Sequence, residues 1–227
     1  MNPGLSAPFA QPRAEWAVTS RRRAALLCLG AIERAAALSM LILLLPAFML
    51  LVVTIAILSR RSPLVAHRRV GLRGESFWML KFRTMWERST PAGPWQWLER
   101  VSTRRAPAAL KSPNDPRVSS RFAAWCRKYS LDEAPQLWHV VTGRMALIGP
   151  RPITAVELRD YYGDSAEEVL TVLPGISGLW QVLGRNRLTY GQRLRLDLFF
   201  VRRRCLGLYW AILKRTPLRV LTGADAG

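Results

Sequence analysis

The chain has 227 residues, half of them hydrophobic, and its 34 lysines and arginines outnumber 15 aspartates and glutamates. This length allows one large domain, or one domain with an appendage. The formal net charge of +19 indicates an anionic partner, such as phosphate groups, nucleic acid or an acidic membrane surface. Three widely spaced cysteines without a CxxC pair favour free or buried thiols in a reducing compartment, and the two histidines, His67 and His139, make no metal pattern.

Residues 1–34 are interpreted as a loose arm followed by a basic flank. A signal peptide is a poor fit, because the arm is long and no small-residue cleavage site follows it cleanly. The next segment, 35–59, has 25 residues without a charge and is rich in Leu, Ile, Val and Met. As a helix it would be roughly 37 Å long, enough to cross a hydrocarbon layer of about 30 Å. A straight membrane span is therefore the simplest interpretation.

Pro46 favours a different topology for the same segment. It leaves 11 uncharged residues before it and 13 after it, so each half is roughly half a membrane thick. Proline removes a helical hydrogen bond and kinks a helix. Both flanks of the segment are basic, and basic flanks favour the cytoplasmic side. A re-entrant helix-break-helix hairpin would keep both ends there, although proline also occurs in ordinary spans.

A small β-hairpin is expected after the apolar segment. Gly71 and Gly74 supply a turn between two short runs of strand-forming residues. The second run ends in the residues KFRTM, where strand alternation places Lys81 and Arg83 on one face. Such a pair is either a solvated strand end or a clamp on a diphosphate.

Two adjacent carboxylates, Asp132 and Glu133, follow a helix expected from about Ser120. Acids placed side by side repel, so one of them needs cations, hydrogen bonds or a metal. The simplest interpretation is a helix start. Ser130 with Glu133 fits a capping box, but Pro135 would then lie inside the helix, where it clashes. Asp132 as the N-cap would instead place Pro135 at the third helical position, where no donor is needed.

Four motifs occur in one order along the chain. They are KFRTM at 81–85, YSLDEAPQLW at 129–138, GRMALIGPRP at 143–152, and LPGISGLWQV at 173–182 with GR at 184–185. Together they resemble the bacterial sugar transferase family, the small monotopic polyprenyl-phosphate sugar-1-phosphate transferases. The resemblance covers roughly residues 35–222, and larger members of the family carry an additional multi-span N-terminal region.

The resemblance implies a mechanism and a set of site residues. A nucleotide diphosphate sugar, usually UDP-linked, would bind with Mg²⁺, and Asp132 would attack the sugar-bearing phosphorus before polyprenyl phosphate accepts the sugar phosphate. Asp132 and Glu133 would offer oxygen ligands to Mg²⁺, and Glu133 would hold the metal or assist proton removal. The expected phosphate and nucleotide ligands are Lys81, Arg83, Arg151 and Arg185. The glycines expected to bring backbone amides close to phosphate are Gly149, Gly175 and Gly178.

The chain departs from the family pattern at several positions outside the acidic pair. The family often has a serine, an acid, a basic residue, a tyrosine and an acid where this chain has Leu45, Arg34, Leu173, Phe200 and Tyr209. The acid that is absent at Tyr209 puts a direct metal or base role there in doubt. After Asp197, aromatic and aliphatic residues alternate with arginines, which predicts a helix lying on an anionic membrane.

The sequence thus predicts a mainly α protein with a small β-hairpin, monotopic in the membrane, with a re-entrant segment and interfacial amphipathic helices. The expected parts are the arm 1–34, the re-entrant hairpin 35–59, a catalytic domain 60–222 and a tail 223–227. The active site is expected at the cytoplasmic face of the inner membrane, where the enzyme would initiate exopolysaccharide or other surface glycan synthesis with lipids and no nucleic acid as partners.

Two alternatives stay open. A catalytically impaired membrane-bound scaffold of the same fold would explain the departures, since a fold does not fix a function. A basic nucleic-acid-binding protein would explain the charge, but the uncharged segment and the lack of a recognition motif count against it. Neither the sugar nor the oligomeric state is indicated by the sequence.

Overall fold

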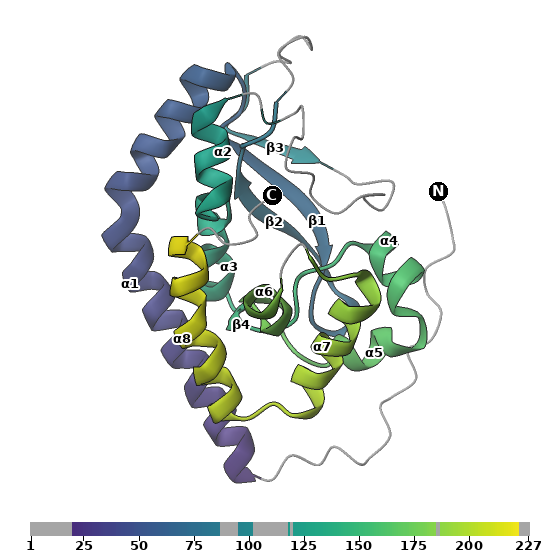
Figure 1. Cartoon of the computed structure of the whole chain (residues 1–227). Coiled ribbons are helices and arrows are strands. Elements are labelled where there is room, and N and C mark those ends of the chain that lie inside the picture. The colour runs from purple at the N-terminus through teal and green to yellow at the C-terminus, as the bar shows by residue number, and fades with distance from the viewer. Residues whose placement is uncertain (1–19, 87–94, 102–117, 119, 185–186, 223–227) are drawn as a thin grey trace.

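The computed structural model describes residues 20–86, 95–101, 118, 120–184 and 187–222. One long helix, α1 (Ser20–Ser59), runs along one side of the molecule, and the other helices and the sheets lie on its inner side (Figure 1). The predicted mainly helical class with small β elements is confirmed. The arm before residue 20 and the tail after residue 222 lie outside the described residues.

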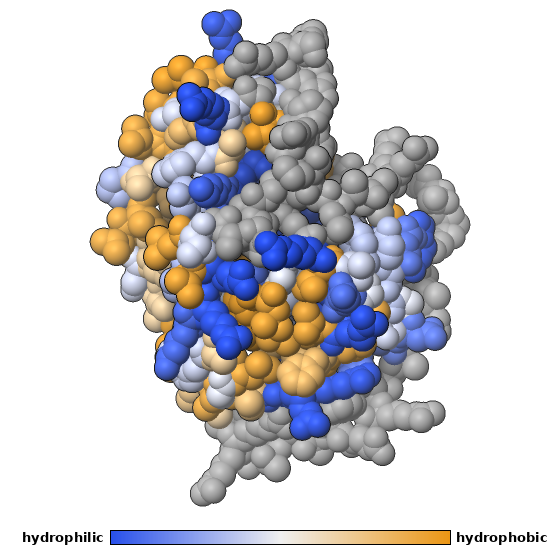
Figure 2. All heavy atoms as spheres, in the orientation of Figure 1, coloured by the Kyte–Doolittle hydropathy of each residue, from blue (hydrophilic) through white to orange (hydrophobic). Residues whose placement is uncertain are grey.

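Helix α1 is apolar enough and long enough to cross a membrane. Within the stretch Leu27–Ser59, an 18-residue segment has a mean hydropathy of 3.0, and the rest of the chain covers little of that segment. Side chains such as Leu43 and Ile57 are 79% and 69% exposed, and apolar residues gather along this side of the molecule (Figure 2). Because large apolar surfaces of this kind are not left in water, the helix marks a membrane-associated protein.

The helix continues through Pro46, so the predicted helix-break-helix is not confirmed. Proline removes one hydrogen bond and crowds the preceding turn, while the bonds on either side of it can persist. The result is a bowed helix whose ends curve toward the rest of the chain (Figure 1). The sequence thus predicted a break where the structure has continuous helix.

The predicted hairpin is confirmed. Strands β1 (Leu64–Val70) and β2 (Ser76–Phe82) are antiparallel, and they are joined by a tight turn that contains the one-turn helix η2 (Leu72–Gly74). Gly74 has a φ of +84°, a conformation that glycine adopts without strain. A third strand, β3 (Leu98–Val101), pairs in parallel with β1, and the sequence analysis did not identify it. This strand has only four residues, and the two central ones are charged, so it is too short to show the alternating pattern of a strand.

The register of the hairpin decides which side chains share a face. Residues paired across β1 and β2 point to the same side of the sheet. Val65 pairs with Lys81, His67 with Met79, and Arg69 with Phe77. The next residue along β1, Arg68, therefore points to the opposite face, and it is exposed.

The second half of the described chain consists of short helices around a two-stranded sheet. Helix α2 (Arg121–Lys128) starts as predicted, with the Ser120 hydroxyl accepting a hydrogen bond from the backbone of Ala123. The elements that follow are η3 (Leu131–Gln136), α3 (Leu137–Val141), β4 (Ala146–Ile148), α4 (Ala155–Glu157), η4 (Leu158–Tyr162), η5 (Gly163–Ser165), α5 (Ala166–Val169), β5 (Gly175–Ser177), α6 (Leu179–Leu183), α7 (Tyr190–Arg202) and α8 (Leu206–Thr222). Strands β4 and β5 are parallel.

Two apolar clusters join these elements to α1 and to one another. The first lies between α1, β2 and α3 and is formed by Ala37, Phe77, Met79, Leu137, Val140 and Met145. The second lies between β4, α6, α7 and α8 and is formed by Ile148, Leu179, Val182, Phe200, Tyr209 and Ile212. The β2–η3–β4 region is therefore held between two packed cores.

A buried acid ties α1 to this second core. Glu33 is 7% exposed, and its Oε1 accepts hydrogen bonds from the Tyr209 hydroxyl at 2.7 Å and from the Leu147 amide at 3.0 Å. The acid expected near the start of the helix is thus present one residue before Arg34. The family often has an acid at the position of Tyr209. In this chain the Tyr209 hydroxyl instead donates a hydrogen bond to Glu33 of α1.

The C-terminal helices bear out only part of the predicted membrane-facing surface. Phe199, Leu206 and Trp210 are each at least half exposed, and they lie among exposed basic residues. Phe200 and Tyr209 are instead buried in the second cluster. The sequence overestimated the apolar outer face because these two residues pack inward.

Candidate active site

The acidic pair lies in η3, a 3₁₀ helix that packs against β2. Ser130 precedes it with a φ of +55° and makes no capping hydrogen bond with its side chain, and Pro135 lies inside the element. Neither predicted helix cap, on Ser130 or on Asp132, is present. A 3₁₀ turn accommodates Pro135 without the α-helical start that the sequence predicted. Asp132 is buried, and the Glu133 side chain is 18% exposed.

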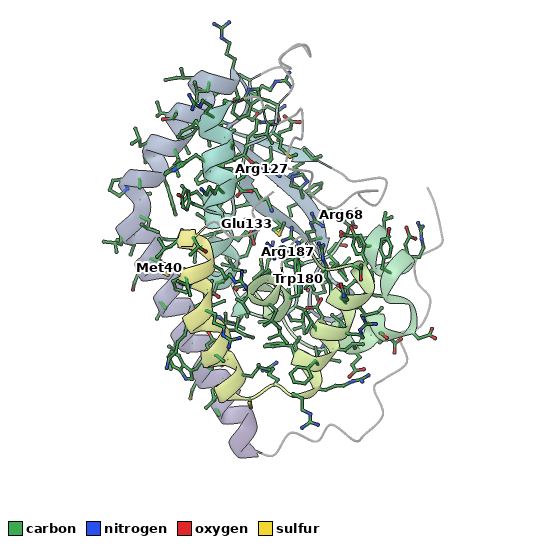
Figure 3. The ribbon with its side chains drawn as sticks, viewed as in Figure 1. Met40, Arg68, Arg127, Glu133, Trp180 and Arg187 are labelled. Carbon is green, nitrogen blue, oxygen red and sulfur yellow. The ribbon has the colours of Figure 1, made fainter. Side chains whose placement is uncertain are left out.

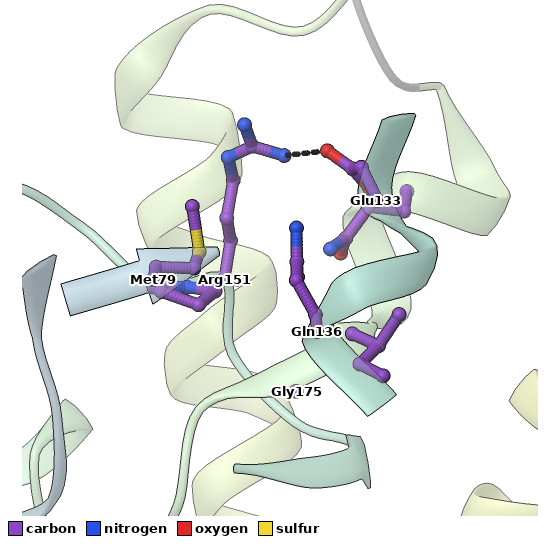
Figure 4. A pocket seen from close by; sticks show the side chains of 8 residues that line it. Met79, Glu133, Gln136, Arg151 and Gly175 are labelled. Carbon is purple, nitrogen blue, oxygen red and sulfur yellow. Dashed lines mark ion pairs between the residues drawn. The ribbon is translucent and has the colours of Figure 1, made fainter. Parts of the chain in front are cut away.

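Cations stabilise Glu133, as two adjacent acids require. The Lys81 ammonium donates a hydrogen bond to Glu133 Oε1 at 2.8 Å, and the Arg151 guanidinium approaches the same oxygen at 3.7 Å (Figure 4). The structure therefore brings together three of the predicted site residues, Lys81 of β2, Glu133 of η3 and Arg151 of the segment after β4. Charge-assisted contacts of this kind hold a carboxylate in its ionised form.

Two other predicted phosphate ligands are not placed beside Glu133. Arg83 is buried, donates to the Ser62 carbonyl at 2.6 Å and pairs with Glu99 of β3 at 2.5 Å. Its guanidinium thus joins the sheet to the segment before β1. Arg185 lies outside the described residues.

The three glycines lie close together, but their backbones contact one another. A side-chain carbon at Gly149 would lie 2.8 Å from the amide nitrogen of Gly175, and one at Gly178 would lie 2.3 Å from the Gly149 carbonyl oxygen. The Gly149 amide donates to Ser177 and the Gly175 amide to Pro150. The lack of side chains therefore lets β4 and β5 approach closely, and the backbone bonds occupy the amides of Gly149 and Gly175.

An aromatic and arginine column adjoins Arg151 and was missed by the sequence analysis. The guanidinium carbons of Arg151 and Arg193 lie 5.6 Å and 4.5 Å from the centre of the Trp180 ring. Arg193 also lies 5.4 Å from the Tyr190 ring, which stacks on Tyr161 at 4.0 Å. Each contact is of the cation–π or stacked aromatic type. Trp180 and Glu133 both lie between the sheet and the C-terminal helices, whereas Met40 lies on α1 (Figure 3).

Arg69 was also missed. Its Nη1 pairs with Glu157 Oε2 at 3.1 Å, and Glu157 forms a capping box with Thr154 at the start of α4. Its Nε is buried without a hydrogen-bond partner among the described residues. Burial and the nearby Arg151 charge lower the pKa of Arg69 to about 10. The T-x-x-E pattern at 154–157 predicts the capping box, but no sequence pattern reveals its pairing with β1.

A buried acid lies behind the column. Asp197 of α7 is 1% exposed and accepts a hydrogen bond from the Tyr162 hydroxyl at 3.0 Å. Burial raises the pKa of Asp197 to about 7, although the Tyr162 bond and the charges of Arg151 and Arg193 act in the opposite direction. Asp197 is the acid of the C-terminal segment that the sequence analysis named. It lies close enough to Arg151 and Arg193 for their charges to act on its pKa.

Asp132 directly precedes Glu133 in η3. Burial raises the pKa of the Cys126 thiol to about 11, with a further contribution from the charge of Asp132, so this carboxylate lies near α2. A pocket beside Glu133 is lined by Met79, Glu133, Gln136, Arg151, Pro152, Gly175, Ile176 and Gln181 (Figure 4). The pocket is thus lined by one ion-paired acid, Glu133, and by its partner Arg151, and Asp132 is the neighbour of Glu133 in the chain.

The donor set fits Mg²⁺ only with help from a substrate. Within the described parts of the chain, no group of three or more His, Cys, Asp or Glu side chains is placed to hold a metal. Asp132 and Glu133 offer two carboxylates. Mg²⁺ is commonly bound by one or two carboxylates together with substrate phosphates and water. The residues present therefore fit a metal that arrives with a phosphate ligand.

The fold and the site together describe a membrane-associated protein in which one acid of an adjacent carboxylate pair lines a pocket and pairs with Lys81 and Arg151. A model of the family described as "Bacterial sugar transferase" matches residues 26–223. The chain belongs to this family, and the predicted resemblance is confirmed.

Named relatives agree with this assignment. The chain is 43% identical over 189 residues to a UDP-galactose-lipid carrier transferase of Erwinia amylovora, across 79% of this chain and 37% of the relative. It is 38% identical over 171 residues to the exopolysaccharide production protein ExoY of Sinorhizobium fredii, across 71% of both chains. It is 40% identical over 157 residues to an undecaprenyl-phosphate galactose phosphotransferase of Salmonella typhimurium, across 68% of this chain and 32% of the relative. The match thus spans about a third of the Erwinia and Salmonella proteins.

Proposed function

We propose that the protein transfers a sugar-1-phosphate from a UDP-sugar to polyprenyl phosphate and so initiates the synthesis of a surface glycan. The observation that carries the proposal is the Asp132–Glu133 pair beside Lys81 and Arg151, at 2.8 Å and 3.7 Å from Glu133. The names of the relatives from Erwinia and Salmonella support the lipid acceptor and the sugar nucleotide class. Neither the sugar nor the glycan follows from these residues.

The proposed reaction has two steps. In the first, a carboxylate oxygen of Asp132 attacks the sugar-bearing phosphorus and forms an acyl phosphate. The bond from this phosphorus to the bridging oxygen breaks, and UMP leaves with that oxygen and the electron pair. In the second step, a phosphate oxygen of polyprenyl phosphate attacks the same phosphorus, and the Asp132 carboxylate is released. This is covalent catalysis by a carboxylate.

Glu133, Lys81 and Arg151 would manage charge around that phosphorus. Phosphoryl transfer depends on positioning and on electrostatic stabilisation of the phosphate oxygens. The guanidinium of Arg151 can bind two oxygens at once, and Lys81 holds Glu133 at the mouth of the pocket. We further propose that Asp132 and Glu133 hold Mg²⁺ together with the diphosphate. When bound, the ion would supply positive charge to the phosphate oxygens.

The membrane placement belongs to the same proposal. Helix α1 would enter and leave one leaflet, with the Pro46 bend at its deepest point and both basic flanks on the cytoplasmic face of the inner membrane. Anionic lipids would contact the basic C-terminal helices. The catalytic part, residues 60–222, would then lie at headgroup depth, where a soluble donor and a lipid acceptor can meet.

The proposal is tested by extracting the protein from membranes and assaying it with a panel of UDP-sugars and polyprenyl phosphate. UMP release and a lipid-linked sugar diphosphate are expected with at least one donor. A protein that binds the substrates without turnover would be an impaired scaffold, and one that is washed off membranes and retained by nucleic acid would contradict the proposal.

The topology is tested by cysteine accessibility at residues 10–30 and 62–75. Both segments should react from the cytoplasmic side, and labelling from opposite sides would identify a spanning helix. Pro46→Leu should shift the population toward the spanning form, because it removes the bend.

A further inference from the structure

His139 is a buried imidazole that bonds the strand carrying Lys81 to the helix that follows the acidic pair. It belongs to α3 and is 4% exposed. Its Nε2 accepts a hydrogen bond from the backbone amide of Leu80 at 3.0 Å, and Leu80 directly precedes Lys81 in β2. Because β2 is an outer strand of the three-stranded sheet, this amide points away from β1 and needs an acceptor from another element.

Two contacts therefore fix β2 against the η3–α3 segment, which lies beside it (Figure 1). One is the bond from Leu80 to His139, and the other is the ion pair of Lys81 with Glu133 at 2.8 Å. The two contacts start from neighbouring residues of β2. The backbone bond restricts how far β2 can slide or tilt relative to η3, and it thereby restricts where the Lys81 ammonium lies.

The main chain of His139 reaches the third segment of the site. Its carbonyl oxygen accepts hydrogen bonds from the amides of Arg144 at 2.9 Å and Met145 at 3.0 Å. Met145 directly precedes β4, the strand that leads to Arg151. The three segments that supply the lysine, the acid and the arginine of the site therefore meet at this one residue.

The surroundings of the ring keep it neutral, as an acceptor must be. Phe77 packs against it in a T-shaped contact, with the ring centres 5.4 Å apart. Burial, with a contribution from the Arg144 charge, lowers the pKa of His139 to about 4. Since Nε2 accepts from Leu80, the proton of the neutral ring lies on Nδ1, which is buried and has no hydrogen-bond partner among the described residues. An unpaired buried donor is costly, so packing alone does not account for an imidazole at this position.

We propose that His139 is a positioning residue that holds the Lys81 ammonium on Glu133 by bonding the neighbouring amide of β2. It acts through Lys81 and not on the substrate. Loss of the acceptor lets β2 move against η3 and loosens the ion pair. The expected effect on turnover rests on the proposed function, whereas the effect on the ion pair does not.

Glutamine and leucine separate the acceptor from the bulk of the ring. In His139→Gln the amide oxygen can take the place of Nε2 and remain an acceptor for Leu80. His139→Leu fills part of the same space without an acceptor. Val140→Ala is the matched control, because Val140 is the next residue, is 1% exposed and packs in the cluster that contains Phe77. It loosens the packing there but removes no hydrogen-bonding group.

The test is the rate at which Lys81 reacts with an amine reagent in the full chain in lipid nanodiscs. Peptide mass spectrometry measures the rate, with the exposed Lys214 as the internal reference. Lys81 should react about three- to tenfold faster in His139→Leu, because part of a charge-assisted hydrogen bond is lost. It should react at nearly the wild-type rate in His139→Gln and Val140→Ala. An unchanged rate in His139→Leu, or an equal increase in Val140→Ala, would overturn the inference.

A second measurement does not depend on whether His139→Leu folds. Nitrogen NMR of the wild type, labelled at its two histidines, should show a neutral ring protonated on Nδ1 near pH 7 that is missing from His139→Gln. A ring at this position protonated on Nε2 could not accept from Leu80 and would contradict the inference.

Neither measurement needs turnover, so failure of the proposed reaction would be seen separately, as absence of UMP release by the wild type. Where the wild type is active, His139→Leu should lose about tenfold in kcat through misplacement of Lys81, and His139→Gln should recover most of it. Wild-type kcat in His139→Leu would show that the position of Lys81 does not depend on this bond.

Discussion

Helix α1 and the pocket around Glu133 differ in how the chain builds them. The helix is one continuous segment, Ser20–Ser59, whose outer apolar side chains are exposed. The pocket draws Lys81 from β2, Glu133 from η3 and Arg151 from the segment after β4. The helix depends on composition and length, whereas the pocket depends on how distant segments pack.

One residue connects the two regions. Glu33 belongs to α1, yet it is buried and accepts hydrogen bonds from Tyr209 and from Leu147 in β4. Because β4 leads directly to the Arg151 segment, the start of the helix and the pocket share a fixed anchor. The comparison therefore predicts that a change in the pocket alters chemistry and spares the fold, and that a change at Glu33 alters the fold first.

The largest effect is expected at the nucleophile. Asp132→Asn keeps the shape of the side chain but cannot form an acyl phosphate, so turnover should fall by about 10³-fold or more. Thermal unfolding and membrane association should change little. UMP release with polyprenyl phosphate present measures the effect, and Asp164→Asn, an exposed acid, is the matched control. Wild-type turnover by Asp132→Asn would remove the covalent mechanism.

A change at the anchor should instead reduce stability. Glu33→Ala leaves the buried Tyr209 hydroxyl and the Leu147 amide without their acceptor, at a cost of about 2–4 kcal/mol for the two groups. Glu33→Gln retains an acceptor oxygen and should recover part of the loss. Thermal unfolding in detergent or nanodiscs measures both variants. If Glu33→Ala unfolds at the wild-type temperature, the anchor does not couple the two regions.

A change at Arg151 should reduce activity and not stability, and it should reduce activity less than a change at Asp132. Arg151→Lys keeps the charge but loses the fork that binds two phosphate oxygens, so activity should fall by about ten- to a hundredfold with stability unchanged. Steady-state kinetics with the UDP-sugar measures the change. Arg159→Lys is a suitable control, because Arg159 is exposed and pairs with its sequence neighbour Asp160. Equal activity of Arg151→Lys and the wild type would place Arg151 outside the phosphate site.

The smallest effect concerns the pH dependence of stability. The raised pKa of Asp197 means that the folded state keeps this proton up to about pH 7, while the unfolded chain releases it near 3.8. The contribution of Asp197 to stability is therefore fully present below pH 3.8 and is lost as the pH rises toward 7. Asp197→Asn keeps an acceptor for Tyr162 and should lose less stability than the wild type over this range. Parallel curves of unfolding temperature against pH for the two proteins would contradict the assignment.

The contrast between helix α1 and the pocket also explains how much of the structure could be predicted from the sequence. The apolar helix, the hairpin around Gly74 and the acidic pair were predicted because each depends on neighbouring residues along the chain. The helix caps proposed for Ser130 and Asp132 were wrong, because local preference does not show that η3 packs as a 3₁₀ turn against β2. Local preference is a weak guide where tertiary contacts compete with it.

Contacts between residues that lie far apart in the chain could not be predicted. Arg69 meets Glu157 across 88 positions, and Tyr209 meets Glu33 across 176, so no pattern in the chain links them. Arg83 looked equivalent to Lys81 on one strand face, but Glu99 of the unpredicted strand β3 engages it. The sequence thus indicated the types of side chain that the site needs, and packing selected which of them meet.

The central claim is that Asp132 carries the sugar phosphate between the two substrates. The most direct measurement is peptide mass spectrometry of the wild type after incubation with a UDP-sugar that supports turnover, without polyprenyl phosphate. The account predicts UMP release in proportion to enzyme and one phosphosugar adduct on Asp132, which disappears when polyprenyl phosphate is added. Transfer to the lipid at the normal rate without any adduct, or an adduct on another residue, would contradict it.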